Sequence, residues 1–194
     1  LKSTLPSSMA SSRSWAQGTS SHTMVHFSSV TARRIHSGFT PRRSTAFDAE
    51  TKQWGEQVDT LWNAKEMNGS VCHPKISPDG KYLLYTVAAY GTFPIWHRET
   101  ELQMMNLQTG AIDSLKNVNS NRSETYHSWS SNSRWFVFAS KRGDGQYGKP
   151  YFCYVDENGQ AHKPFVLPQK HPDHYDMTLK SFNIPDLSAS PTPF

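Results

Sequence analysis

The sequence predicts an all-β fold made of β-propeller blades: about two and a half four-stranded blades, which form an incomplete ring. The first observation is a near repeat, because segment 73–86 returns in altered form at 127–140, with Ser77 and Ser130 lying 53 residues apart. Repeats on this scale are typical of stacked supersecondary units. The second observation is that the strand after each repeated turn is apolar on both faces, which indicates a sheet covered on both sides. A β-sandwich also has short strands and regular turns, but it does not explain why one turn and one aromatic strand recur together.

The first full blade is expected over residues 69–125. Its four strands are expected at 71–76, 81–87, 102–107 and 111–115. The first two strands are joined by the sequence Ser-Pro-Asp-Gly at 77–80, where proline presets φ early in a turn and glycine accepts a positive φ. The alternation that follows places Leu84 on one face of the second strand, and Leu83 and Tyr85 on the other.

The second blade is expected over residues 126–170, with Asn132 and Ser133 in the turn positions that the first blade gives to aspartate and glycine. Its later strands are expected at 135–138, 150–155 and 163–167. The sequence Asp-Glu-Asn-Gly at 156–159 predicts a hairpin turn, since Asn-Gly suits the twist of flanking strands.

Residues 44–68 read as a partial blade, and residues 171–194 as a proline-rich C-terminal extension. Residues 1–43 are left unassigned, because their Ser/Arg/His-rich composition is typical of disorder, of an unrelated tail or of mistranslated text. Within them, only 24–27 favours a short strand.

Composition narrows the function classes. The net charge of +4 is spread along the chain with no basic cluster, so we expect no nucleic-acid partner. No apolar run reaches the roughly 18 residues of a membrane span, and no signal-peptide pattern is visible. Cys72 and Cys153 match no metal motif. Cys153, within a strand-like run, is expected to be a buried thiol, and whether the two cysteines pair is left open.

The repeat resembles that of the TolB-like, WD-like β-propellers of bacterial periplasmic proteins, and in particular large TolB-like proteins of Bacteroidetes-type bacteria. The resemblance is carried by residues 76–85, 90–97, 119–130 and 180–185, and it extends over about 44–187. The family closes its ring with six or more blades, so this chain is expected to be a fragment, or to need further blades or oligomerisation to close.

The resemblance implies a non-catalytic scaffold that recognises a protein or ligand in the periplasm or at the cell envelope, without a cofactor. The alternative is the gating propeller of a prolyl-oligopeptidase-type serine peptidase, because such propellers share the Ser-Pro-Asp-Gly turn. The chain that follows the blades here is a Pro/Ser-rich tail, not a catalytic domain, and we therefore expect no enzyme.

The segment between two strands of the first blade is the best candidate for binding a partner. It holds a cluster of aromatic and apolar side chains in a loop: Tyr90, Phe93, Ile95, Trp96 and His97. Loops on rigid scaffolds carry recognition, and Trp and Tyr are common interface anchors. The alternative is that these rings pack over the neighbouring blade.

Other candidate sites have simpler interpretations. The cluster at 171–176 has metal-ligand residue types but a proline within it and no distant partner pair, so we expect a surface loop. A calcium site is not expected at Asp79, Asn132, Asp156 and Asn158, because the alternating acidic pattern of an EF-hand loop is absent. No nucleophile elbow or P-loop lysine is present, so the glycines at 142–148 indicate a loop. His127 and the serines at 128 and 130 are expected to bind backbone, or each other, within the blade.

Overall fold

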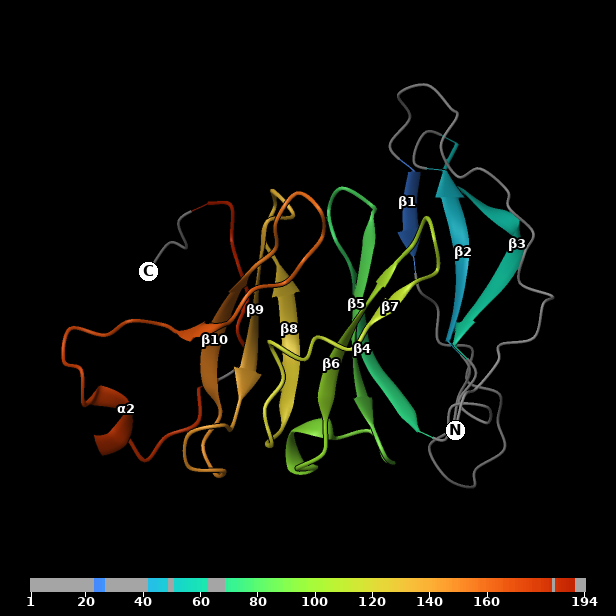
Figure 1. The fold of residues 1–194 in the computed structure, drawn as a ribbon. Coiled ribbons are helices and arrows are strands. Elements are labelled where there is room, and N and C mark those ends of the chain that lie inside the picture. Colours follow the sequence, from blue (N-terminus) through green and yellow to red (C-terminus); the bar gives the residue numbers. More distant parts are fainter. Residues whose placement is uncertain (1–22, 27–41, 49–50, 63–68, 183, 191–194) are drawn as a thin grey trace.

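The structure is a computed structural model that describes residues 23–26, 42–48, 51–62, 69–182 and 184–190. The described residues form three antiparallel sheets that follow one another along the chain (Figure 1). The first sheet has the order β1-β2-β3, with strands β1 (Thr23–His26), β2 (Arg42–Asp48) and β3 (Gln53–Trp62). The second has the order β4-β5-β6-β7, with strands β4 (Ser70–Ile76), β5 (Tyr82–Ala88), β6 (Glu101–Asn106) and β7 (Ile112–Asp113). The third has the order β8-β9-β10-β11, with strands β8 (Glu124–Trp129), β9 (Trp135–Ser140), β10 (Lys149–Tyr154) and β11 (Phe165–Val166).

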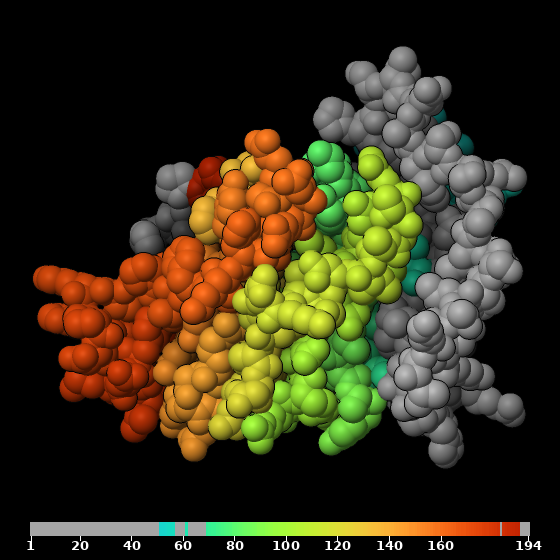
Figure 2. Space-filling view, in the orientation of Figure 1, coloured from blue at the N-terminus to red at the C-terminus, as the bar shows by residue number. Residues whose placement is uncertain are grey.

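We call the second and third sheets blade A and blade B. Each is a four-stranded antiparallel meander, and one packs directly against the other (Figure 2). This arrangement confirms the expected fold class of propeller blades in an open ring. Two details differ from the expectation. The first sheet starts well before residue 44, since it includes β1, and blade B starts at Glu124 because β8 is two residues longer than the repeat indicated.

The repeated turn has the same hydrogen bonds in both blades. In blade A, Ser77 Oγ donates to Asp79 Oδ1 at 2.6 Å and accepts the Tyr82 amide at 3.0 Å. In blade B, Ser130 Oγ donates to Asn132 Oδ1 at 2.7 Å and accepts the Trp135 amide at 3.0 Å. The turn therefore needs a hydroxyl followed two residues later by a side-chain oxygen, which either Asp or Asn supplies.

The final turn position needs a left-handed backbone in both blades. Gly80 has φ of 72°, and Ser133 holds φ of 59° at the matching position. Ser133 Oγ accepts a hydrogen bond from the Asp79 amide at 2.9 Å, so the two turns are linked directly. Serine is therefore needed at position 133 for this hydrogen bond, which glycine, having no side chain, cannot form.

The innermost strand of each blade has a β-bulge at the same repeat position. The pairing register shifts between Cys72 and Lys75 in β4 and between Thr125 and Ser128 in β8. His73 and Tyr126, which lie within these shifts and are also 53 residues apart, both have φ of 52°. The repeat is thus preserved as backbone geometry even where the side chains differ.

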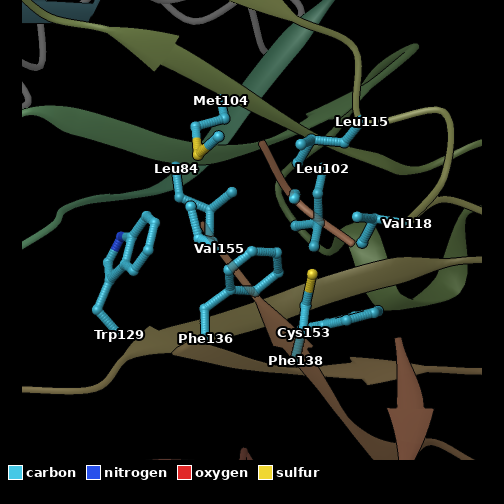
Figure 3. Packing of buried hydrophobic residues seen from close by; sticks show 11 residues of the cluster. Leu84, Leu102, Met104, Leu115, Val118, Trp129, Phe136, Phe138, Cys153 and Val155 are labelled. Atoms are coloured by element: carbon cyan, nitrogen blue, oxygen red, sulfur yellow. The ribbon is translucent and has the colours of Figure 1, made fainter. Parts of the chain in front are cut away.

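The main core lies between the two blades (Figure 3). Leu84, Leu102 and Met104 of blade A meet Phe136 and Phe138 of blade B. The rest of this interface core is completed by Leu115, Val118, Trp129, Cys153, Val155 and Ala161. Large rings from blade B and aliphatic side chains from blade A thus form one contiguous core in a chain with 36% hydrophobic residues.

The opposite face of blade A carries a second core cluster of Val71, Leu83, Tyr85 and Met105. Leu61 of the first sheet packs against this cluster. Blade A is thus covered on both sides, and Leu84 faces one neighbour while Leu83 and Tyr85 face the other, as the two-sided apolar pattern predicted.

Polar contacts also join the blades. His127 is buried, and its Nε2 donates to the Leu84 carbonyl oxygen at 2.9 Å, so it binds the backbone of blade A and not, as expected, a partner within its own blade. Trp129 Nε1 donates to the Lys75 carbonyl at 3.2 Å. Both contacts join β8 to blade A and fix the position of the innermost strand of blade B.

Candidate functional site

We call residues 89–100, between β5 and β6, the rim loop. It contains a short 3-10 helix, η2 (Pro94–Trp96), drawn as the green coil at the lower end of the sheets in Figure 1. Alternate connections of a meander fall at the same end of a sheet, and the β9–β10 loop therefore lies at this end as well. The rim loop thus belongs to one face of the stacked blades.

Pro94 anchors the rim loop. It is buried at the start of η2, and its carbonyl accepts hydrogen bonds from Thr100 Oγ1 at 2.8 Å and from Ser123 Oγ at 3.1 Å. Ser123 directly precedes β8, so this carbonyl ties the loop to blade B. A second tie is the hydrogen bond from Arg98 Nε to the Asn121 carbonyl at 3.0 Å. The loop base is therefore rigid on both sides.

The large rings of the loop point into solvent. Tyr90 is 63% exposed, Phe93 67% and Trp96 78%, while Ile95 is half-buried. Pro94 is buried, whereas these three rings stay more than half exposed, although the Trp96 ring lies against Lys141 of blade B. Three largely exposed aromatic side chains thus lie on one anchored loop, and exposed apolar surface of this kind commonly marks interaction sites.

His97 supports the loop from within. Its ring meets the Tyr90 ring edge-on with 4.3 Å between centroids, and its Nδ1 lies 3.4 Å from Glu99 Oε1. Gly91 has φ of 78°, and a Cβ built there would lie only 3.2 Å from His97 Nε2. Glycine is thus needed both for the backbone conformation and for room beside the imidazole.

Lys141 contributes to the site from blade B. It directly follows β9 and is nearly buried, its Nζ lies 4.4 Å from the centre of the Trp96 ring, and its amide donates to the Ser123 carbonyl at 3.1 Å. Burial lowers the pKa of Lys141 below the usual lysine range. A cation at this distance over the ring is attracted by the face of the indole. Sequence reasoning missed this residue, because a lysine at a strand end looks like ordinary surface charge.

Glu124 organises the blade B side of the rim and was also missed. It is fully buried at the first position of β8, where its Oε1 accepts Ser120 Oγ at 2.6 Å and Ser140 Oγ at 2.8 Å. Arg142 Nη2 lies 3.3 Å from the same oxygen and donates to the Val118 carbonyl at 2.7 Å. Burial raises the pKa of Glu124, while the serine hydrogen bonds and the arginine charge act in the opposite direction.

The remaining sequence candidates serve the turns. Asp79 Oδ1 accepts the Lys81 amide at 3.2 Å, and Asn132 Oδ1 accepts the Arg134 amide at 3.1 Å. Asp156 Oδ1 accepts the amides of Asn158 and Gln160, each at 2.9 Å. In the described ranges, no group of three or more His, Cys, Asp or Glu side chains is arranged to hold a metal ion.

The cluster at 171–176 lies in a loop and the short helix α2 (His174–Met177). His171 and Asp173 are exposed, and the His174 ring meets the Tyr175 ring edge-on at 5.2 Å. The segment 142–148 connects β9 to β10 as the glycine pattern predicted.

Cys72 and Cys153 are both buried, and they are not joined by a disulfide. Cys153 lies in the interface core and donates to the His162 carbonyl at 3.0 Å. Burial raises the pKa of Cys153 to about 12, so the thiolate is absent at neutral pH. The prediction that Cys153 is a buried thiol is confirmed.

These features define an all-β chain of stacked propeller-type blades with an anchored aromatic loop at one rim. Among solved structures, the chain is similar to TolB from Acinetobacter baumannii at 18% identity and a TM-score of 0.38, over 66% of this chain and 26% of that protein. It is also similar to a puromycin hydrolase at 16% identity and a TM-score of 0.40, over 63% and 18% of the two chains. A structure from a study of two prolyl endopeptidases matches at 16% identity and a TM-score of 0.34, over 76% and 29%.

The chain spans less than a third of the length of each of these proteins. No family model matches the sequence, and no curated protein matches it. Identities and TM-scores this low carry no functional argument, and the fold class therefore rests on the blades themselves. Within the described residues, no helix is long and apolar enough to cross a membrane.

Proposed function

We propose that this chain is a non-catalytic, TolB-like propeller scaffold that recognises a protein partner through the rim loop. The single observation that supports it best is the contrast within the loop, where a buried Pro94, whose carbonyl accepts three hydrogen bonds, supports rings that are more than half exposed. A fixed base lowers the entropic cost of binding, because the loop backbone does not need to be ordered when the partner arrives.

The chemistry of the site favours a partner with an apolar pocket bordered by acidic groups. Phe93 and Trp96 offer aromatic anchors, and Lys141 supplies a positive charge directly below the indole. Aromatic anchors surrounded by polar groups are the usual composition of binding hot spots. We further propose, from the sequence resemblance alone, that the setting is the periplasm or envelope of a Bacteroidetes-type bacterium.

The test is affinity capture with the immobilised full chain from an envelope fraction, carried out in parallel with Trp96→Ala. Trp54→Ala is the matched control, because Trp54 is also a half-exposed tryptophan but lies in β3, outside the rim loop. We expect proteins retained by the wild type and by Trp54→Ala to be lost with Trp96→Ala. Equal retention by all three would remove the rim loop from recognition.

The peptidase alternative is a prediction that the same material can test. If the chain belongs to the gating propeller of a serine peptidase, the captured species should include a protein labelled by an active-site serine reagent, and capture should be insensitive to Trp96→Ala.

A further inference from the structure

Three basic side chains beside the rim loop come from three chain segments that meet just before β8. Arg98 of the rim loop donates its Nε to the Asn121 carbonyl at 3.0 Å. Lys141, directly after β9, donates its backbone amide to the Ser123 carbonyl at 3.1 Å. Arg122 lies between these two contacts in the sequence. We call Arg98, Arg122 and Lys141 the rim cations.

Arg122 lies against the turn that Lys141 begins. Gly145 donates its amide to the Lys141 carbonyl at 2.8 Å. A Cβ built on Gly145 would lie only 2.9 Å from Arg122 Cζ, so the guanidinium covers this turn closely. At the start of the same turn, Lys141 Nζ lies 4.4 Å from the centre of the Trp96 ring. Two of the rim cations therefore share one turn, which also contacts the exposed aromatic loop.

The carboxylates near the rim cations are bound to other groups. Each of them contacts a different side chain: Glu124 with Arg142, Asp144 with Lys149, and Glu99 with His97. Asp144 acts on Lys141 only from a greater distance, and burial still lowers the pKa of that lysine. In the described part of the chain, no carboxylate lies within ion-pair distance of a rim cation.

Lys141 is a nearly buried cation without a hydrogen-bond acceptor. The residue is 9% exposed, and the group that its ammonium contacts is the face of the Trp96 ring. Removing an ammonium group from water costs free energy unless an anion pairs with it. A carboxylate that reached Lys141 would form a charge-assisted hydrogen bond and offset that cost. The site is therefore arranged to receive an anion from outside the chain.

We propose that the rim binds an acidic peptide segment, in which one carboxylate pairs with Lys141 and Arg122 while a neighbouring apolar side chain packs on Trp96. This inference rests on the proposed recognition of a protein partner and names the chemistry of the contact. A guanidinium can bind both oxygens of one carboxylate, which a second ammonium group cannot do with the same geometry. The exposed indole beside the cations supplies the apolar half of the contact.

The distribution of charge favours a peptide over a lipid surface or a nucleic acid. The side chains of Glu99 and Asp144 are 47% and 37% exposed, and a continuous anionic surface would repel both. A single carboxylate side chain can reach the rim cations without meeting them. Nucleic acids bind to basic groups that follow the backbone over several nucleotides, whereas the net charge of +4 is spread along this chain.

The first test is a selection of displayed random heptapeptides on the immobilised full chain. We expect the retained peptides to be enriched in an acidic residue next to an aromatic or aliphatic one. Selections on Arg122→Gln and on Lys141→Gln should lose the acidic preference. Arg134→Gln is the matched control, because it removes the same charge from the β8–β9 turn at the opposite end of blade B. Circular dichroism checks the fold of each variant, and Arg122→Gln alone is sufficient if Lys141→Gln does not fold.

The second test measures the affinity of the most enriched peptide by fluorescence polarisation. Replacing its acidic residue by the corresponding amide should weaken binding to the wild type by about tenfold. The same replacement should have little effect on binding to Arg122→Gln. Raising the salt concentration from about 0.05 M to about 0.5 M should weaken the acidic peptide more than the amide, because the charges are then screened.

The outcomes separate this inference from the proposed function. Peptides that lack acidic residues, but that Trp96→Ala no longer retains, would overturn the inference and leave recognition by the rim loop in place. No enrichment, or enrichment insensitive to Trp96→Ala, would contradict both. Sedimentation of the chain with phosphatidylglycerol vesicles, without acidic enrichment in the selection, would assign the rim to a lipid surface and overturn the inference.

Discussion

His127 should make the blade interface sensitive to acid. The imidazole is buried between β8 and blade A, where Nε2 donates to the Leu84 carbonyl at 2.9 Å. Burial, together with the neighbouring His73, lowers the pKa of His127 from 6.5 to about 3. Its Nδ1 is buried and has no hydrogen-bond partner in the described part of the chain.

Because the pKa of His127 is lower in the folded chain than in the unfolded chain, acid should destabilise the fold. Below pH 6.5 the unfolded chain binds a proton at this histidine while the folded chain does not, so stability falls as the pH falls toward 3. Between pH 7 and pH 5 this single group should cost about 2 kcal/mol of the free energy of unfolding, from about 1.4 kcal/mol per pH unit below the unfolded pKa. Such a loss is a large share of the 5–15 kcal/mol typical of a domain.

The assay is urea unfolding at pH 7 and pH 5, at one protein concentration, for the wild type and His127→Gln. Glutamine keeps an amide that can donate to the Leu84 carbonyl but does not titrate. The wild type should lose about 2 kcal/mol more than the variant, since all carboxylates are common to both. Equal pH dependence in the two proteins would refute the reasoning.

Three further predictions follow from packing, turn geometry and thiol burial. Phe138→Ala should lower the free energy of unfolding by about 3–5 kcal/mol, whereas Phe165→Ala, at a half-exposed ring, should cost less than about 1 kcal/mol in the same urea titration. Gly80→Ala should cost about 1 kcal/mol because φ is 72°, and Gly148→Ala, without a positive φ and with no atom near its Cβ, should be nearly neutral in thermal unfolding. Cys153 should react with an aromatic disulfide reagent only after unfolding, and labelling of the native chain at this residue, read by mass spectrometry, would contradict its burial.

Much of the fold could be predicted from the sequence because its signal is local. The Ser-Pro-Asp-Gly turn recurs with the same side-chain hydrogen bonds, and alternation in β5 correctly separated Leu84 from Leu83 and Tyr85. The positions of Phe182 and Asp186 could not be predicted in this way. Their hydrogen-bond partners are Gly148 and Ser128, which are far away in sequence, so no local pattern marks either contact.

The candidate site was predicted only in its exposed part. The rings of the rim loop are visible as an aromatic cluster in a loop sequence, whereas Lys141 and Glu124 look like surface charges at strand ends. They are buried because each finds a partner in the folded chain, the Trp96 ring for one and two serines with Arg142 for the other. Burial of a charge depends on such tertiary partners, which local pattern does not record.

The hydrogen bond between the two repeated turns runs from the Asp79 amide of blade A to the Ser133 hydroxyl of blade B. Ser133 offers its hydroxyl backward to the Asp79 amide of the preceding blade, but Gly80, which holds the same position in blade A, has no side chain to offer to the sheet before it. Blade A therefore differs in its contacts with its two neighbours. The Ser133 hydroxyl links its turn to blade B, whereas Gly80 has no side chain that could form the same hydrogen bond to the first sheet. Mechanical or thermal loosening of the chain should begin on the side of the first sheet, leaving blades A and B joined as the last folded unit.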